Sequence, residues 1–315
     1  MGIQGLLPFL DSIGESVHVS CFSGKRCAID GYAWLHRGAK RCPLEMVRKQ
    51  PTTGFVDYCM GLIDLLVRAG VTPFVVFDGA PLPAKAGTEK SRAAGRQRAI
   101  AGANELLRAG RHKEAMDRFH AAVDITPAHA RQLILALRTR GIVSIVAPYE
   151  ADAQLALLAR RGDVDFVLTE DSDLMAFGCP CVLYKMDREG NGRLLRREAL
   201  ATACNPADEM GAPLFSPWEA WDGGLFLDMC ILAGCDYLPN LPGLALKTAH
   251  KLLRRHGSVG QLLRVWRMEG HEAPPGGFDM YEKQVVPSPP SPHPTLTPHP
   301  HSTLAPPSPH PHPTL

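Results

Sequence analysis

Four short apolar runs in this chain end in acidic residues or lead directly into them. They are RCAID at 26–30, TPFVVFD at 72–78, IVSIVAP at 142–148 and DFVLTED at 165–171. Such short, near-continuous apolar runs predict strands that are covered on both faces, as in a parallel sheet. Helical patterns at 55–69 and 128–139 lie between them. The alternation predicts an α/β fold with a mostly parallel twisted sheet flanked by helices.

The acids after these runs form the candidate metal site. In open α/β sheets ligands bind at the carboxyl ends of the strands, so we expect these acids to converge on one cleft. The predicted ligands are Asp30, Asp78, Glu150, Asp152, Asp171 and Asp173, with Asp236 of the segment GCDYL as a seventh. If the chain stays extended from 169 to 173, Asp171 and Asp173 project to one side and Glu170 to the other. Glu170 is therefore left out.

Each acid also has a purely structural interpretation. Asp30 and Asp78 are suited to capping the helices that follow them. Glu150 and Asp152 would complement the dipole of a helix at 149–160 from its first turn. Any one of these acids could lie at a strand end by chance. It is much less expected that all of them do.

Clustered carboxylates need bound cations, because like charges resist joint ionisation. Oxygen ligands at this density favour Mg²⁺, with Mn²⁺ as a substitute, over zinc. Two such ions roughly 4 Å apart stabilise both the attacking and the leaving oxygens of a phosphodiester displacement. The sequence contains no Walker glycine loop, nucleophile elbow or HExxH motif, which argues against an NTPase, an esterase and a zincin.

Positive charge is concentrated in two segments, although the whole chain carries a formal charge of only +2. Residues 85–140 contain twelve Lys or Arg against five Asp or Glu, and residues 247–267 contain six Lys or Arg and no acid. Separate basic segments suit a polyanion-binding surface beside a metal site. The first of these segments begins in a long helix-prone excursion, at 84–123, whose glycines Gly87, Gly95, Gly102 and Gly110 weaken it as one rigid helix.

The chain divides into five predicted parts. They are an N-terminal α/β region with the start of the excursion at 1–99, the remaining excursion and internal α/β region at 100–203, a Pro/Gly-rich loop at 204–224, a second helical module at 225–268 and a disordered Pro/His-rich tail at 269–315. The tail contains PHPTL twice, and its composition cannot build a core. No apolar run approaches the length of a membrane span, so we expect no membrane partner.

Six segments together resemble the flap-endonuclease superfamily of 5′ nucleases, and within it the exonuclease 1 branch. They are MGIQGLLPFL, AIDGYAWLHRGA, VFDG, APYEADAQLA, TEDSDLMAFG and CILAGCDYL. The resemblance runs from Met1 to about Arg255. It implies a PIN-like 5′-nuclease fold, a helical arch over the active site at the basic excursion, and a helix–two-turn–helix module near the C-terminus.

The resemblance also implies roles for individual residues. All seven acids match the metal ligands of the family. Lys85 and Arg92 match catalytic cations at the scissile phosphate, a role in which positive charge stabilises the transition state. The implied DNA contacts are Tyr32, His36, Arg96, Gly243, Lys247 and Lys251. A potassium ion is implied in the helix–two-turn–helix, although Gly243-Leu244-Ala245 departs from the Gly-x-Gly of the family, which puts that ion in doubt.

The expected function is a Mg²⁺-dependent, structure-selective 5′→3′ double-stranded DNA exonuclease with 5′-flap endonuclease activity, acting in repair or recombination. Nicked, gapped, 5′-recessed or 5′-flap duplexes are the expected partners, and the nucleus is the expected location. Family cores continue past the position of Arg267, so closing helices and the tail that binds mismatch-repair proteins are expected to be missing. The alternatives are a flap endonuclease with little exonuclease activity, or a truncated, catalytically inert protein that binds DNA junctions.

Overall fold

The computed structural model describes residues 2–204, 213–216 and 224–285. Within these ranges the centre of the fold is one seven-stranded sheet, with the order β1-β7-β6-β5-β2-β3-β4. The strands are β1 Glu15–His18, β2 Arg26–Asp30, β3 Thr72–Phe77, β4 Val143–Val146, β5 Phe166–Thr169, β6 Cys181–Tyr184 and β7 Asn191–Arg196. The run β6-β5-β2-β3-β4 is parallel throughout, and β7 is antiparallel to both of its neighbours. The prediction of a mostly parallel sheet is therefore confirmed.

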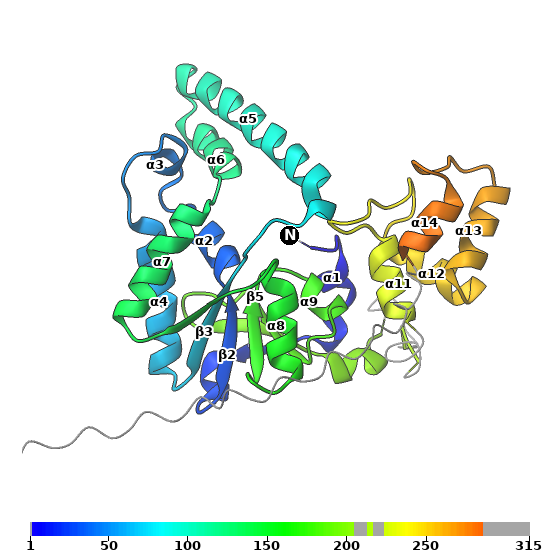
Figure 1. Ribbon diagram of the computed structural model, residues 1–315, viewed down its shortest axis with the longest axis horizontal. Helices are drawn as coiled ribbons and strands as arrows, with labels where there is room; N and C mark the ends of the chain where they lie inside the picture. The colour runs from blue at the N-terminus through cyan, green and yellow to red at the C-terminus, as the bar shows by residue number, and fades with distance from the viewer. Residues whose placement is uncertain (1, 205–212, 217–223, 286–315) are drawn as a thin grey trace, which may run out of the picture.

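Side-chain alternation along the strands divides the core into two layers. In β2, Cys27 and Ile29 pack on one face, while Ala28 packs on the other. The first face is covered by α2 Gly31–Ala39, α4 Gly54–Arg68 and α7 Pro127–Thr139. The second is covered by α1 Leu6–Phe9, α8 Ala151–Arg160 and α9 Asp173–Ala176 (Figure 1). Because both faces are buried, the parallel strands read as unbroken apolar runs.

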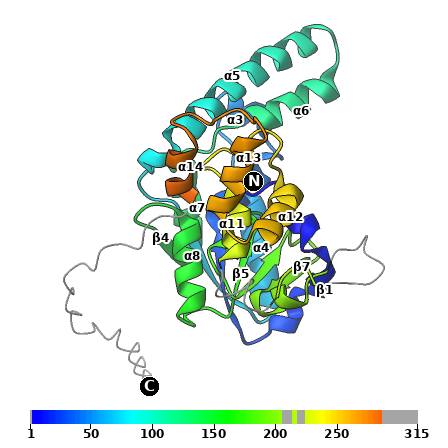
Figure 2. The same cartoon turned by 90° about the vertical axis from the view of Figure 1, so that its right-hand side faces the viewer.

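The basic excursion forms the predicted helical arch. It consists of a short 3₁₀ turn at Pro83–Lys85, the long helix α5 Ala86–Arg108 and the returning helix α6 His112–Ala122. The two helices project away from the sheet (Figures 1 and 2). Ala103, Ala115 and Phe119 form a small core between them, against which the neighbouring helix α3 Pro43–Val47 packs.

The helix α5 continues through three glycines that were expected to weaken it. Gly87, Gly95 and Gly102 all lie within it, and Gly110 lies beyond its end in the left-handed conformation, with φ +74°. A glycine inside a helix costs about 1 kcal/mol relative to alanine. Helix propagation over many residues, together with the contacts with α6, offsets that cost.

The C-terminal module is built from four helices. They are α11 Leu225–Leu232, α12 Leu246–His256, α13 Val259–Met268 and α14 Phe278–Val285. Its buried side chains belong to the same cluster as the second face of the sheet, so sheet and module share one core. Among the described residues, no helix is long and apolar enough to cross a membrane.

Two of the predicted segments, 204–224 and 269–315, lie partly outside the described residues. The prediction that residues 269–315 are a disordered tail is wrong for α14, because Phe278, Tyr281 and Val285 share one helical face and are buried. The remaining tail, 286–315, lies outside the described residues. Most of the predicted loop at 204–224 also lies outside them, but Cys204 and Pro213 pair as an isolated bridge and Phe215 is fully buried.

Candidate active site

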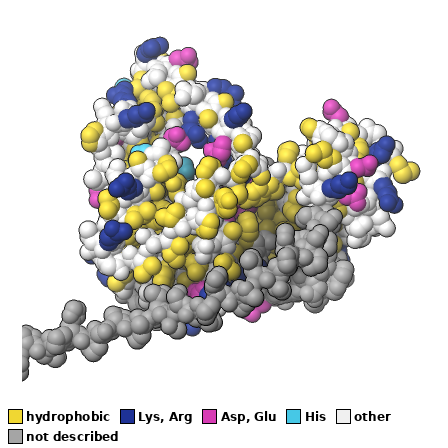
Figure 3. Space-filling view, in the orientation of Figure 1, with side chains coloured by type: hydrophobic (Ala, Val, Ile, Leu, Met, Phe, Trp, Pro, Cys, Tyr) yellow, Lys and Arg dark blue, Asp and Glu magenta, His cyan; other side chains and the backbone are white. Residues whose placement is uncertain are grey.

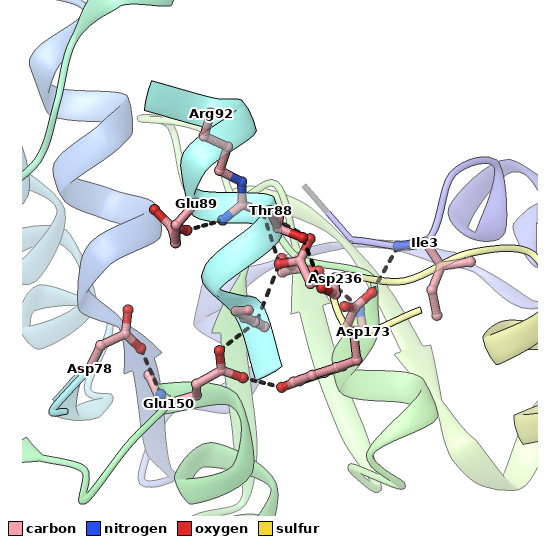
Figure 4. A network of polar contacts seen from close by, with 12 residues as sticks. Ile3, Asp78, Thr88, Glu89, Arg92, Glu150, Asp173 and Asp236 are labelled. Carbon is pink, nitrogen blue, oxygen red and sulfur yellow. Dashed lines mark hydrogen bonds and ion pairs between the residues drawn. The ribbon is translucent and has the colours of Figure 1, made fainter. Parts of the chain in front are cut away.

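The predicted metal ligands gather at the carboxyl ends of the parallel strands. Asp30 is the last residue of β2, and Asp78 follows β3 directly. Glu150 and Asp152 flank the start of α8, and Asp171 and Asp173 follow β5. Asp236 follows α11, and Figure 4 shows its side chain between the arch and Asp173.

Backbone donors orient several of these carboxylates. The N–H of Ala33 donates to Asp30 Oδ1 at 2.9 Å, and the N–H of Ala151 donates to Asp78 Oδ1 at 2.7 Å. The capping interpretation of Asp30 therefore also holds, because its side chain caps α2. A cap fixes the carboxylate with one oxygen, which leaves the other free for further contacts.

The buried acids are crowded enough to resist ionisation. Burial, followed by the charges of Asp78 and Asp171, raises the pKa of Asp30 to about 7. Burial and the charge of Asp171 likewise raise the pKa of Asp173 to about 7. Asp152 is affected by four other acids of the cluster, and burial with their charges raises its pKa well above the usual range. A divalent cation would relieve this repulsion, and the donor set consists of oxygens alone, which fits Mg²⁺ or Mn²⁺.

These acids are not already arranged as a finished coordination shell. Among the described residues, no three His, Cys, Asp or Glu side chains converge closely enough to hold one metal ion. Two of the acids are instead held by cations of the arch. Lys85 Nζ lies 2.5 Å from Glu150 Oε1 and 3.2 Å from Asp236 Oδ2.

Arg92 completes this arrangement from two helical turns further along the chain, in α5. Its Nη2 donates to both carboxylate oxygens of Asp236, at 2.9 and 2.8 Å (Figure 4). Partial burial opposes ionisation of Asp236, but Arg92 and Lys85 together hold its pKa below the usual range. The base of the arch thus places two cations against Glu150 and Asp236 of the acid cluster.

The predicted DNA-contact residues lie outside the acid cluster. Tyr32 packs edge-to-face on Phe77 with ring centroids 6.2 Å apart, and it is only partly buried. His36, one helical turn further along α2, is exposed. Arg96 lies deeper in the arch and pairs with Asp124 at 3.3 Å.

The other three predicted DNA contacts lie on the C-terminal module. Gly243 has a φ of +82°, and Lys247 and Lys251 are exposed on α12. Ala245, which replaces the second glycine of the family loop, caps α12 with a φ of −79°. Any L-residue adopts that conformation, so alanine causes no backbone strain there.

Four residues of the site, Gly2, Ile3, Thr88 and Tyr237, were not predicted from the sequence. A Cβ on Gly2 would lie 2.1 Å from Asp171 Oδ1, so the chain start is packed against the acids, and the N–H of Ile3 donates to Asp173 at 2.8 Å. Thr88 and Tyr237 join the arch to the loop that follows α11. Two features of the sequence pointed toward these residues. Gly2 lies at the apolar start of the chain, and Tyr237 directly follows the predicted ligand Asp236.

Lys and Arg side chains are spread over the arch and over the C-terminal module (Figure 3). They face solvent at both places, in agreement with the two basic segments of the sequence. A mostly parallel sheet whose strand ends carry clustered acids, beneath a basic helical arch, has the architecture of a PIN-like fold.

Comparisons with known proteins agree with this class. Residues 1–99 match the XPG N-terminal domain and residues 141–236 match the XPG I-region. Exonuclease 1 of Danio rerio is 44% identical over 254 residues, which cover 81% of this chain and 30% of the relative. Exodeoxyribonuclease 1 of Schizosaccharomyces pombe is 39% identical over 279 residues, 89% of this chain and 47% of the relative. The chain thus spans 30% and 47% of the length of these two relatives.

Solved structures support the fold. The catalytic core of Rad2 in complex with DNA substrate matches with a TM-score of 0.62 at 19% identity, covering 90% of this chain and 80% of that chain. Flap endonuclease-1 from Methanococcus jannaschii matches with a TM-score of 0.54 at 23% identity, covering 90% and 84%. The chain belongs to the exonuclease 1 branch of the flap-endonuclease superfamily.

Proposed function

We propose that this chain is a structure-selective DNA nuclease that removes nucleotides in the 5′→3′ direction from nicked, gapped or 5′-recessed duplexes and also cleaves 5′ flaps. The observation that carries the proposal is the arch base, where Lys85 and Arg92 pair with Glu150 and Asp236 beside the acids at the strand ends. Cations above a carboxylate cluster suit phosphodiester hydrolysis, in which negative charge develops on the phosphate oxygens.

Two Mg²⁺ ions, for which Mn²⁺ would substitute, are the proposed cofactors. When bound, they would supply Lewis acidity at the scissile phosphate. Asp30, Asp78, Glu150 and Asp152 would dominate one ion, and Asp171, Asp173 and Asp236 the other. Within that arrangement, Lys85 and Arg92 would neutralise the developing charge from their positions beside Glu150 and Asp236.

The proposed DNA contacts flank this centre on two sides. Tyr32 and His36 would meet the strand end where the duplex bends, because a ring stacks on any base, with a gain of roughly 1–3 kcal/mol. Arg96 would meet the displaced strand. Gly243, Lys247 and Lys251 would hold the duplex backbone through phosphate contacts and a potassium ion, without reading the sequence.

Turnover on a nicked duplex is the deciding measurement. We expect the chain to release nucleotides from a 5′-labelled nick with Mg²⁺ and to stop when EDTA is added. An Asp173→Asn variant should bind the same duplex but not cleave it. If the native chain binds nicked DNA without turnover, it is an inert junction-binding protein, and if it cleaves only flaps, it is a flap endonuclease.

The setting in the cell is also a proposal. Membership of the exonuclease 1 branch supports a nuclear repair role and mismatch-repair proteins as a class of partner. A tagged chain that stays out of the nucleus would contradict the first, and a failure to co-purify such proteins would contradict the second.

A further inference from the structure

The first turns of α5 rest on the loop that carries Asp236. Thr88 Oγ1 donates to the backbone carbonyl of Asp236 at 2.9 Å, one helical turn before Arg92 reaches its carboxylate (Figure 4). This contact is between a side chain of the arch and the main chain of the loop. It therefore fixes the position of the helix even when the carboxylate of Asp236 is engaged elsewhere.

Tyr237, the next residue of the loop, contacts both partners of the Lys85–Glu150 ion pair. Lys85 Nζ lies 4.7 Å from the centroid of the Tyr237 ring, and the Tyr237 hydroxyl donates to Glu150 Oε2. Lys85 Nζ meets the other oxygen, Glu150 Oε1. The ring is 40% exposed, so burial of the aromatic side chain in the core does not account for its placement.

We propose that Thr88 and Tyr237 form a seat for Lys85, and that both are positioning residues of the nuclease. Lysine has a long flexible stem, and its ammonium samples many positions unless its surroundings restrict it. In the seat the ring lies against the ammonium, the hydroxyl orients the carboxylate partner, and Thr88 holds the start of the helix that Lys85 precedes. The ammonium is thereby held near the acids before substrate arrives, which is preorganisation of the kind that raises the rate of the chemical step.

The inference rests on the proposed function, and a double-mutant cycle separates it from a general structural role. We expect Tyr237→Phe, which keeps the ring, to slow single-turnover cleavage of a nicked duplex by about 3-fold, and Tyr237→Leu to slow it by about 10-fold or more. Affinity for the duplex should change by less than about 2-fold. In a Lys85→Ala background both substitutions should change the rate by less than about 2-fold, since their effect acts through Lys85.

Two outcomes of the cycle overturn the proposal. If the substitutions slow cleavage by the same factor with and without Lys85, Tyr237 acts through Glu150 or through the fold. If neither changes the rate of the native chain, no seat exists. Tyr149→Phe is the matched control, since the Tyr149 side chain is 53% exposed, and its rate should stay native.

A second measurement does not depend on turnover. Thr88→Val removes the donor at nearly constant volume, so amide hydrogen exchange in residues 86–92 should quicken by about 5-fold. Exchange in α6 should not change, and Thr139→Val in α7 should leave residues 86–92 at the native rate. Unchanged exchange at 86–92 in Thr88→Val overturns the seat even if the native chain proves inactive, whereas inactivity with the expected exchange refutes only the nuclease function.

Discussion

Asp173 is a residue at which function and stability are in conflict. Its pKa rises from 3.8 to about 7 in the folded chain, because burial and Asp171 disfavour the charged form. Between these values the folded state therefore holds a proton that the unfolded state has released. The free energy of unfolding of the metal-free chain accordingly falls as pH rises through this range.

We expect Asp173→Asn to stabilise the metal-free chain while abolishing cleavage. At about pH 8 in EDTA the free energy of unfolding should rise by about 1–3 kcal/mol, since the amide carries no charge to be buried. Below about pH 4 the gain should vanish, because the native carboxyl is then protonated in both states. Urea denaturation at both pH values measures the difference. An equal gain at both would show that charge is not the cause.

Asp165 provides a control of opposite sign. The backbone N–H of Arg26 and the charge of Lys25 hold its pKa below the usual range. Asp165→Asn should therefore lower the free energy of unfolding at neutral pH instead of raising it.

Gly2 is the residue at which the backbone leaves no room for a side chain. Besides the contact with Asp171, a Cβ there would lie 2.6 Å from Asp173 Oδ1, and the φ of +83° disfavours any L-residue. We expect Gly2→Ala to displace these acids and to lower the cleavage rate by about 100-fold.

Gly5→Ala isolates the effect of the contact. Gly5 has the same φ of +83°, but a Cβ there would meet nothing within 4 Å. Both variants carry a backbone cost of about 1–2 kcal/mol, and only Gly2→Ala introduces the clash. Equal cleavage rates in the two variants would mean that the start of the chain does not shape the site.

Among the elements, the parallel strands were the most predictable from sequence. A strand that is buried on both faces has an unbroken apolar run, and the acids of the site follow at its end. One local pattern therefore predicts both the strand and the site residue. Three strands were missed. β1 and β7 lie on the antiparallel side of the sheet, where ESVH and NGRLLR carry polar side chains on exposed positions. Edge strands need fewer apolar residues, and their local signal is correspondingly weak. β6 is apolar, but its four residues CVLY are too short a run to distinguish a strand from other buried segments.

The helix α14 was missed for a different reason. Its apolar residues have helical spacing, but Pro274, Pro275, Gly276 and Gly277 precede them and dominate the composition of the segment. A compositional average over this segment hides one short helix. The helix α14 packs against α13, α11 and the loop that carries Pro239, and such tertiary packing is not visible in the local sequence pattern.

The arch offers a test of helix propensity within one element. Gly102 lies inside α5 and Gly110 just beyond it, and a Cβ at either would meet nothing within 4 Å. Gly102→Ala should raise the free energy of local opening of α5 by about 0.5–1 kcal/mol. Gly110→Ala should lower it by about 1 kcal/mol, because its φ of +74° is left-handed. Amide hydrogen exchange along α5 measures both, and changes of the same sign would contradict this account.

At the scale of the whole molecule, the site depends on segments that are far apart in the chain. Six of the seven acids could be predicted because each belongs to a local strand-end pattern, whereas Asp236 was predicted from the segment GCDYL. Gly2, Thr88 and Tyr237 could not, because their roles come only from contacts with residues far away in sequence, such as Thr88 with Asp236 and Tyr237 with Glu150. A long-range contact leaves no periodicity in the sequence on either side.

The shared core makes a prediction about how the molecule unfolds. Tyr281 of α14 is only 2% exposed, and its hydroxyl donates to the carbonyl of Pro239 at 3.1 Å, in the loop that carries Asp236. The buried cluster around it continues without a break into the second face of the sheet. We therefore expect the sheet and the C-terminal module to unfold together in one cooperative transition.

Tyr281→Ala tests this cooperativity. Removing a buried aromatic side chain should lower the free energy of unfolding by about 3 kcal/mol or more. The midpoint in urea should fall equally by circular dichroism, which reports all helices, and by the fluorescence of Trp34 in a background where the other three Trp are replaced by Phe. Trp34 is buried on the opposite face of the sheet. Met280→Ala, on the 52% exposed neighbour, should leave the free energy of unfolding within about 0.5 kcal/mol of native. An early change in circular dichroism with an unshifted Trp34 midpoint would show that the module unfolds by itself, and the site would then depend on two separate units.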